Sequence, residues 1–350
     1  MNIARLSIYL PSFLLLTALL LSVEACTSDR DEQPRPNVSG VKVDVQLLRF
    51  EQDLFSIDTT RLSEELTRLE QKYPEMLPLF AVNIIHDQTN PNETPVQAVG
   101  GFVGSPQIRQ IYDTVQKVYG DLRWLQKDLD QMFRYYKFYF PQKPVPQVVT
   151  MVSEFATDAF TYGDSLCGVS LDMYLGENYL PYLTDQERFP AYLRRQFRQE
   201  YIPVRLAKAL VQNLADAPPG DRLLDQMLYN GKQLYILDCL LPDTPDSLLM
   251  GYTTAEIEGC QANEAELWAR LLEQNLLYSS DFNNWRKLVT PSPNTPILFQ
   301  EAPGEVGSWM GWQIVKAYMR RHPQTTLTQL LGMSDSQQFL EQAKYKPKRQ

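Results

Sequence analysis

The spacing of apolar residues changes along the chain, and each spacing predicts a different element. Apolar residues fill the segment from Leu6 to Val23 almost without a break. Valines alternate with polar residues over 41–45, which predicts a strand with one buried face. Leucines recur at helical spacing over 59–72 behind capping residues, and Pro74 ends that helix. An apolar leader is thus followed by mixed strand and helix.

Helical spacing returns over 108–140, which predicts two helices separated near Gly120, with Asp121 as the cap of the second. Short β-type segments follow, and the last is GVSLDMYLG (168–176). From Phe189 onward helical spacing dominates again. The expected fold is α+β and mostly helical, with a small mixed β-sheet packed against helices. We expect the strands to form a meander with GVSLDMYLG at its edge.

The N-terminal run has the pattern of an export signal. Its densest part, Phe13–Val23, is short for a membrane span, which needs about 20 apolar residues. The sequence VEAC then resembles the lipobox at which bacterial lipoproteins are cut and acylated. We predict a lipoprotein signal peptide at 1–25, a lipid on Cys26, a flexible tether at 26–40 and a single globular α+β domain at 41–350. An ordinary secretory signal with an incidental Cys26 is the alternative.

The charge of the chain limits the kind of partner that we expect, and its cysteine count limits the disulfides. The chain carries 42 acidic and 33 basic residues, a formal net charge of −9, and no basic stripe that could track phosphates, so we expect no nucleic-acid partner. Beyond Cys26 the cysteines are Cys167, Cys239 and Cys260, an odd number without metal-type spacing. At most one bridge can form among these three, and their disulfide state is left open.

The helix predicted over 200–216 follows the strands and precedes a second helix, an order that resembles zinc metallopeptidases of the zincin type. Those enzymes carry H-E-x-x-H on the first helix, and zinc needs about three protein ligands. This chain has only two histidines, His86 and His322, and neither lies in such a motif. We therefore expect a zincin-like layout without a metal site or cofactor. The inward face of the first helix is expected to carry Leu206, Ala207, Leu210 and Val211.

The chain contains no G-x-S-x-G, P-loop or G-x-G-x-x-G motif, so acyl transfer and nucleotide chemistry lack their usual elements. Catalysis by paired carboxylates is the scheme left to consider. Four acids, Glu154, Asp158, Asp164 and Asp172, lie near the predicted strands. A hydrolase acting on peptide or glycan could use two of them if they faced one cleft about 5 to 9.5 Å apart. The interpretation that we favour is a polar rim around the sheet.

The C-terminal part carries the most specific sequence. It contains GKQLYILDCLLPDTPDSLLMGYT, an N-E-x-x-x-W motif at 263–268, and PGEVGSWMGWQIVKAYM followed by KYKPK. Together with LLRFEQDLFSID and YIPVRLAKALVQ, these segments resemble the gliding motility lipoprotein GldB family over nearly the whole mature chain. The resemblance implies a cell-envelope protein required for the gliding machinery, with no established enzymatic activity.

The last of these segments also resembles one found in zinc peptidases, P-x-x-x-G-x-x-x-G, carried here by Pro303, Gly307 and Gly311. Such glycines allow one backbone to approach another, or a bound chain, with tryptophans filling the space beside them. Packing of a helix start against the core is the alternative. The candidate interaction residues are Asp172, Tyr174, Trp309 and Trp312.

We therefore expect an envelope-anchored lipoprotein that acts without catalysis, as a scaffold or a protein- or peptide-binding component. An extended peptide would lie beside the predicted edge strand. The expected partners are the membrane, through the lipid on Cys26, and proteins of the envelope. No catalytic, cofactor-binding or metal-binding residue is assigned, and a carboxylate-based hydrolase is the alternative.

Overall fold

The computed structural model describes residues 35–86, 90 and 92–348. The predicted signal peptide 1–25, the lipidation site Cys26 and most of the tether lie outside these residues. From Asn37 onward the chain forms one compact unit. Val38 is already buried in the core of that unit, three residues before the predicted start of the domain.

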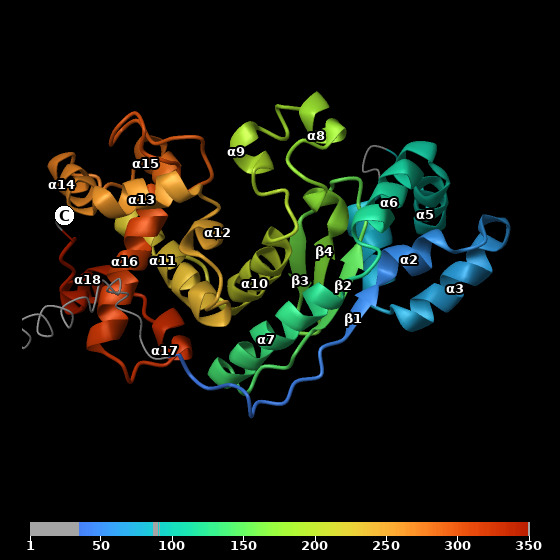
Figure 1. Ribbon diagram of the computed structural model, residues 1–350, viewed down its shortest axis with the longest axis horizontal. Helices are drawn as coiled ribbons and strands as arrows, with labels where there is room; N and C mark the ends of the chain where they lie inside the picture. The colour runs from blue at the N-terminus through green and yellow to red at the C-terminus, as the bar shows by residue number, and fades with distance from the viewer. Residues whose placement is uncertain (1–34, 87–89, 91, 349–350) are drawn as a thin grey trace, which may run out of the picture. The chain divides into compact units, whose positions relative to one another are not determined.

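Four short strands form one mixed sheet in the order β1-β2-β4-β3 (Figure 1). They are β1 (Leu47–Arg49), β2 (Gln147–Met151), β3 (Ala159–Tyr162) and β4 (Leu166–Ser170). β1, β2 and β4 run parallel, while β3 is antiparallel to β4. The sheet is small and helices make up most of the rest, so the predicted α+β, mostly helical fold is confirmed.

The predicted meander with GVSLDMYLG at its edge is wrong. That segment begins with the last three residues of β4, which lies between β2 and β3, and continues as a 3-10 turn, η3 (Leu171–Tyr174). All five residues of β4 are buried, as expected for a strand covered on both faces and paired on both sides. The short 163–165 turn pairs β3 with the outer side of β4, so β3 forms one edge of the sheet and β1 forms the other.

The strand predicted over 41–45 is also absent, since the first strand begins at Leu47. Val45 is buried, but its carbonyl accepts a hydrogen bond from the side-chain amide of Gln126 at 3.0 Å instead of pairing with a strand. Val41 and Val43 pack partly buried against the core. The alternation of valines with polar residues therefore corresponds to a half-buried extended segment that has no partner strand.

The helices between β1 and β2 agree with the predicted spacing. Asp58 accepts from the Thr60 amide at 2.9 Å and so caps a 3-10 turn that leads into the first long helix. The break near Gly120 is present, but the cap residue of the second helix is Leu122 instead of Asp121; the Asp121 carboxylate, one residue earlier, accepts a hydrogen bond from the Arg123 amide at 2.8 Å. These elements are α2 (Phe50–Phe55), η1 (Thr59–Arg61), α3 (Leu62–Lys72), α4 (Met76–Leu79), η2 (Phe80–Ile84), α5 (Pro95–Gly104), α6 (Pro106–Val118) and α7 (Arg123–Tyr139).

Helices also dominate after the sheet, as predicted. They are α8 (Leu180–Thr184), α9 (Ala191–Arg194), α10 (Tyr201–Leu214), α11 (Leu223–Leu240), α12 (Asp246–Met250), α13 (Thr254–Ala262), α14 (Glu264–Glu273), α15 (Phe282–Trp285), η4 (Arg286–Leu288), α16 (Val306–Arg321), α17 (Leu327–Leu331) and α18 (Ser336–Ala343). α10 packs along β3 and β4, with α7 beside it (Figure 1). The four apolar residues predicted for its inward face are all buried.

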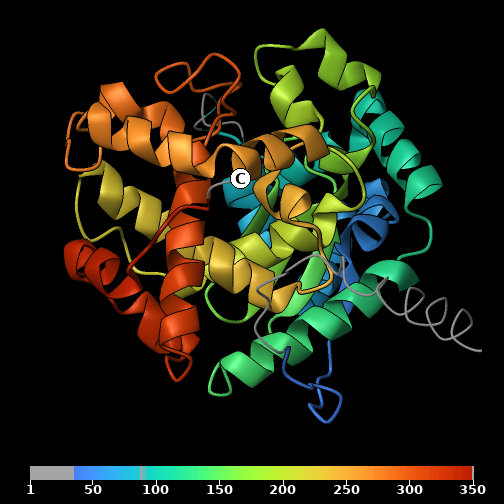
Figure 2. The same cartoon turned by 60° about the vertical axis from the view of Figure 1, so that its left-hand side comes forward.

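α11 and α16 form the most extensive helix pair (Figure 1; Figure 2). Glycines permit their close crossing. A Cβ atom on Gly311 would lie 1.9 Å from the Met227 carbonyl oxygen, and one on Gly231 would lie 2.3 Å from the Gly311 carbonyl carbon. Gly307 similarly lies against the Leu288 backbone. The glycines of the C-terminal motif therefore pack α16 into the core, which was the alternative interpretation of this motif.

Candidate functional site

Charged side chains from three separate segments gather beside the edge of the sheet. Asp158 directly precedes β3, Arg205 and Lys208 lie one turn apart on α10, and Glu305 directly precedes α16. The Arg205 Nε atom lies 3.4 Å from Asp158 Oδ2. The Tyr174 hydroxyl donates a hydrogen bond to the same carboxylate. We call Asp158, Arg205, Lys208 and Glu305 the charged cluster.

Burial and mutual charge both shift the pKa values in the charged cluster. Burial raises the pKa of Glu305, while the charges of Lys208 and Arg205 act to lower it. Burial and the Arg205 charge lower the pKa of Lys208, and the carboxylates of Glu305 and Asp158 oppose this. Burial and the Asp158 carboxylate raise the pKa of Tyr174 well above its ordinary value. Two acids and two cations thus compensate one another in a poorly solvated place.

Glu305 has an uncommon backbone conformation. Its φ of 62° and ψ of 14° lie in the left-handed region, which costs a non-glycine residue about 1 kcal/mol or more. Its side chain does not cap α16, although it stands at the cap position. The Glu305 amide donates to the Lys287 carbonyl at 2.9 Å, and the Tyr252 hydroxyl donates to the Gly304 carbonyl at 2.6 Å. The surroundings therefore impose a strained conformation, which is typical of functional positions.

The four candidate interaction residues are all buried in the core: Asp172, Tyr174, Trp309 and Trp312. Tyr174 alone among them contacts the charged cluster, through Asp158. Trp309 and Trp312 lie on α16, and the Lys316 ammonium stands 3.7 Å from the centre of the Trp312 ring. None of the four presents a surface for a partner, so their role in an interaction stays a prediction.

Asp172 acts as an internal acceptor. Its carboxylate accepts hydrogen bonds from the backbone amides of Phe155 at 2.7 Å and Ser153 at 3.2 Å. This fixes the loop after β2, where Glu154 and Phe155 both have positive φ. Burial raises the pKa of Asp172 to about 6, against the effect of these amides. A carboxylate enclosed in this way stabilises the loop.

The four carboxylates proposed for a hydrolase do not form a pair facing one cleft. Asp158 and Asp164 lie at opposite ends of β3, and this four-residue strand alone spans about 13 Å. Asp164 pairs with Lys143 at 2.9 Å, whereas Asp172 has no solvent exposure. Glu154 is exposed at the loop. The distances required of a glycosidase pair are therefore not met by Asp158 and Asp164.

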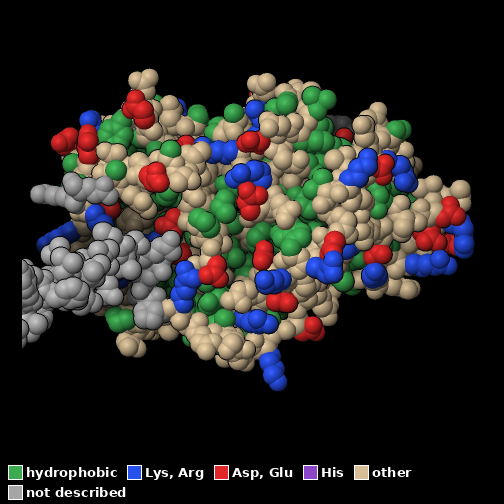
Figure 3. Space-filling model, viewed as in Figure 1, with side chains coloured by type: hydrophobic (Ala, Val, Ile, Leu, Met, Phe, Trp, Pro, Cys, Tyr) green, Lys and Arg blue, Asp and Glu red, His purple; other side chains and the backbone are tan. Residues whose placement is uncertain are grey.

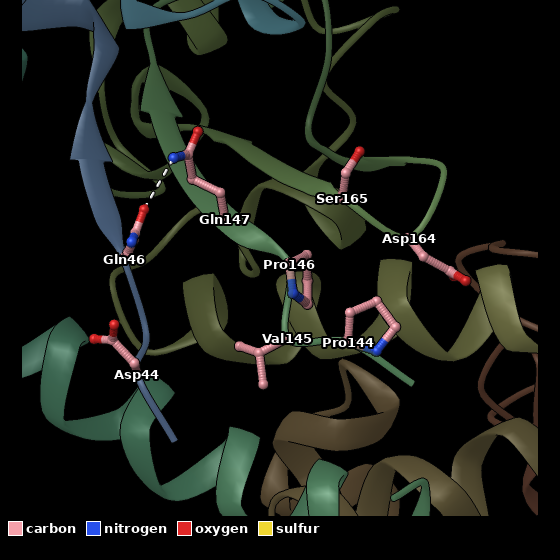
Figure 4. A pocket seen from close by; sticks show the side chains of 8 residues that line it. All are labelled: Asp44, Gln46, Pro144, Val145, Pro146, Gln147, Asp164 and Ser165. Carbon is pink, nitrogen blue, oxygen red and sulfur yellow. Dashed lines mark hydrogen bonds between the residues drawn. The ribbon is translucent and has the colours of Figure 1, made fainter. Parts of the chain in front are cut away.

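A pocket of about 510 Å³ lies at the amino-terminal ends of the parallel strands. Figure 4 shows Asp44 and Asp164 on opposite sides of it, with the segment 144–146 between them. At its upper rim the Gln147 amide donates to the Gln46 amide oxygen at 3.2 Å. Asp164 is the one residue here that the sequence had singled out. The pocket has both polar and apolar lining residues and lies at the opposite end of β3 from Asp158.

The histidines and cysteines occupy separate places. His86 lies 3.4 Å from Glu93, and His322 stacks on Tyr318. The three cysteines Cys167, Cys239 and Cys260 are free thiols. Within the part of the chain that the structure describes, no three His, Cys, Asp or Glu side chains gather in a way that could hold a metal ion.

Sequence analysis did not identify Arg205, Lys208 and Glu305. A local signal was present, because two cations stand one turn apart on a helix that is otherwise largely apolar. Glu305 had no comparable signal, since its backbone conformation follows from the contacts of the loop that precedes α16. Only the packing of α16 near α10 brings the acid into the neighbourhood of these cations.

The surface gives no sign of a single dominant charge on the face shown in Figure 3, where acidic and basic side chains are interspersed. Among the helices that the structure describes, none combines the length and the apolar character needed to cross a bilayer.

Comparison with known proteins identifies one family. The family model for gliding motility protein GldB matches residues 31–347, which is most of the chain. No curated protein and no solved structure matches, so the zincin-like layout stays a prediction. The chain therefore belongs to the gliding motility protein GldB family, which indicates a bacterial envelope lipoprotein with a role in gliding motility.

Proposed function

We propose that this protein is held in the bacterial envelope by a lipid on Cys26 and acts without catalysis, binding an extended segment of a partner protein. The observation that carries the proposal is the open edge of β3. An edge strand with free backbone groups can accept another strand, with main-chain hydrogen bonds supplying affinity. The partner would thus extend the four-stranded sheet to five.

The hydrogen-bond pattern defines which backbone groups are open. The Ser170 amide donates to the Asp158 carbonyl at 2.9 Å, and residues alternate in an antiparallel ladder between bonded and non-bonded pairs. The amide and carbonyl of Ala159 and Thr161 therefore point away from β4. Among the described residues, no hydrogen bond reaches these outward groups. Both residues are partly exposed, and the neighbouring Tyr162 is 49% exposed.

The charged cluster supports a binding role at this edge. Arg205 stands near the start of β3 through its contact with Asp158, and Asn213 binds the Gly163 carbonyl at 3.1 Å beyond the end of β3. α10 thereby holds β3 at both ends and keeps the edge strand straight for pairing. The acids of the cluster are engaged with cations, which favours positioning over nucleophilic or acid-base chemistry.

Replacement of Thr161 by proline tests the edge. Proline lacks the outward amide, which β4 does not use, so Thr161→Pro should leave the fold intact and block strand addition. With a photoreactive residue at Tyr162, we expect irradiation of living cells to cross-link a partner to the otherwise unchanged protein. The Thr161→Pro form should lose this product, and the cells should lose surface spreading.

Thr161→Val is the matched control, because it keeps the amide and should retain both cross-linking and spreading. Circular dichroism and a thermal melt of each variant establish that the fold persists. Undiminished cross-linking in a folded Thr161→Pro protein would rule out pairing at β3. Hydrolysis of peptides that chelators stop, or stoichiometric zinc in the purified protein, would contradict the non-catalytic part of the proposal.

The lipid anchor is tested separately. Cells grown with a labelled palmitate should incorporate the label into the protein, and Cys26→Ser should abolish incorporation and move the protein out of the membrane fraction. Cys260→Ser is the control, because this thiol is buried in the fold and should not affect labelling. Label retained in the Cys26→Ser protein would mean that the lipid is attached elsewhere.

A further inference from the structure

A second, smaller cavity lies far along the chain from the edge of β3. Its volume is about 160 Å³, well above the ~10–15 Å³ that a single water requires. Polar and apolar residues from α15, η4 and the segment that follows them line it. Its lining includes Asn283, Asn284, Arg286, Lys287, Pro296 and Ile297. We call it the anion pocket.

The two cations of the anion pocket have no acidic partner. Among the described residues, no carboxylate oxygen lies within the 4.0 Å of an ion pair from Arg286 or Lys287. The nearest acid in the sequence is Asp281. Its carboxylate instead accepts a hydrogen bond from the side-chain amide of Asn284 at 2.8 Å. Some basic residues of this acidic chain do form ion pairs, as Arg195 does with Glu256. Two adjacent unpaired cations beside a cavity are therefore available to an anion.

The backbone that carries these cations is held firmly. The Lys287 carbonyl accepts from the Glu305 amide at 2.9 Å and from the hydroxyls of Ser292 and Thr295, each at 3.2 Å. The next residue, Leu288, is fully buried against α16. A rigid platform loses little conformational entropy when a ligand binds. The backbone of the site is thus fixed, while the side chains of Arg286 and Lys287 are exposed and accessible to a ligand.

The lining indicates the chemistry of the ligand. A guanidinium and an ammonium together match the oxygens of a phosphate, and the side-chain amide of Asn283 can add a neutral donor. Pro296 and Ile297 supply an apolar wall for the carbon skeleton of an ester. We infer that the anion pocket binds a phosphate ester, either the headgroup of an anionic lipid or a free phosphate compound. This inference does not rest on the proposed role of β3.

An exposed aromatic residue adjoins the anion pocket. Phe282 is 48% exposed, and its ring packs edge-on against Trp285 at 5.0 Å. Aromatic side chains beside cations are typical of surfaces that meet the headgroup region of a bilayer. The lipid source therefore predicts that Phe282 contributes to binding, whereas a free phosphate source does not.

Titration of the purified full chain with glycerol 3-phosphate tests the pocket. We expect saturable binding at low ionic strength, weakened roughly tenfold or more by the double substitution Arg286→Gln and Lys287→Gln. The matched control removes the same charge elsewhere, by Lys117→Gln and Lys127→Gln, and should bind as the unchanged protein does. Absence of binding, equal loss in the control, or equally strong binding of acetate would overturn the assignment.

Vesicles distinguish the two sources. The same proteins are sedimented with phosphatidylcholine vesicles, with or without phosphatidylglycerol, so that any contribution of the N-terminal segment is common to all. A gain with phosphatidylglycerol that Arg286→Gln with Lys287→Gln removes and Phe282→Ser weakens supports the lipid headgroup. Binding of glycerol 3-phosphate without such a gain supports a free phosphate ester.

Discussion

Gly311→Ala is expected to destabilise the protein by about 3 kcal/mol or more. The added Cβ would lie 1.9 Å from the Met227 carbonyl oxygen and 2.5 Å from its carbon, both in the backbone of α11. A helix backbone cannot move aside as a flexible side chain can, so α11 and α16 must separate. Alanine favours a helix over glycine by only about 1 kcal/mol, which does not offset this repulsion. Urea denaturation followed by circular dichroism measures the loss.

Gly259→Ala is the matched control for this substitution. Gly259 lies within α13, and an added Cβ there would meet no atom within 4 Å. The same chemical change should therefore leave stability unchanged or raise it by about 0.5 to 1 kcal/mol. If the two variants unfolded at the same urea concentration, the close crossing of α11 and α16 would not be a determinant of stability.

Removal of the Asp172 carboxylate is expected to have a comparable effect. Asp172→Ala leaves the amides of Ser153 and Phe155 without their acceptor at a fully buried site, which should cost about 3 kcal/mol. The loop that they hold contains two residues with positive φ, so its strain would no longer be opposed. Denaturant unfolding gives the loss, and proteolysis should reach the loop sooner.

Asp172 also predicts a dependence of stability on pH. Its pKa is about 6 in the native state and 3.8 as the ordinary value, so the native state binds more protons between these limits. The stability contributed by this proton is fully present below 3.8 and is lost as the pH rises through about 6. Asp172→Asn cannot ionise. The unfolding free energy of the unchanged protein relative to Asp172→Asn should therefore fall from about pH 4 to about pH 7.

The control for the pH series is Asp113→Asn, since Asp113 is exposed on α6. Its unfolding free energy should follow that of the unchanged protein over the same range. Parallel pH profiles for the unchanged protein and Asp172→Asn would mean that Asp172 has the same pKa in the folded and unfolded states. Burial would then contribute no proton linkage at this residue.

Local sequence patterns were sufficient to predict many of the helices and the family of this protein. Helical spacing of apolar residues predicted α3, the pair α6 and α7 with its break near Gly120, and α10 with its buried face. The motifs of the C-terminal part indicated the family that residues 31–347 match. These features are readable from sequence because helix periodicity and capping depend on residues within a few positions of one another.

The tertiary structure decided what depends on distant contacts. Strand alternation at 41–45 did not reveal whether a partner strand exists, and GVSLDMYLG did not reveal on which side β3 would fold back. Strand order depends on pairing between residues far apart in the chain. β4 lies inside the sheet because it pairs with β2 on one side and β3 on the other. The charged cluster likewise unites Asp158, two cations of α10 and Glu305 from far apart in the chain. The strain at Glu305 follows from the contacts of the loop that precedes α16, and the compensation of these charges arises only when this loop lies near α10.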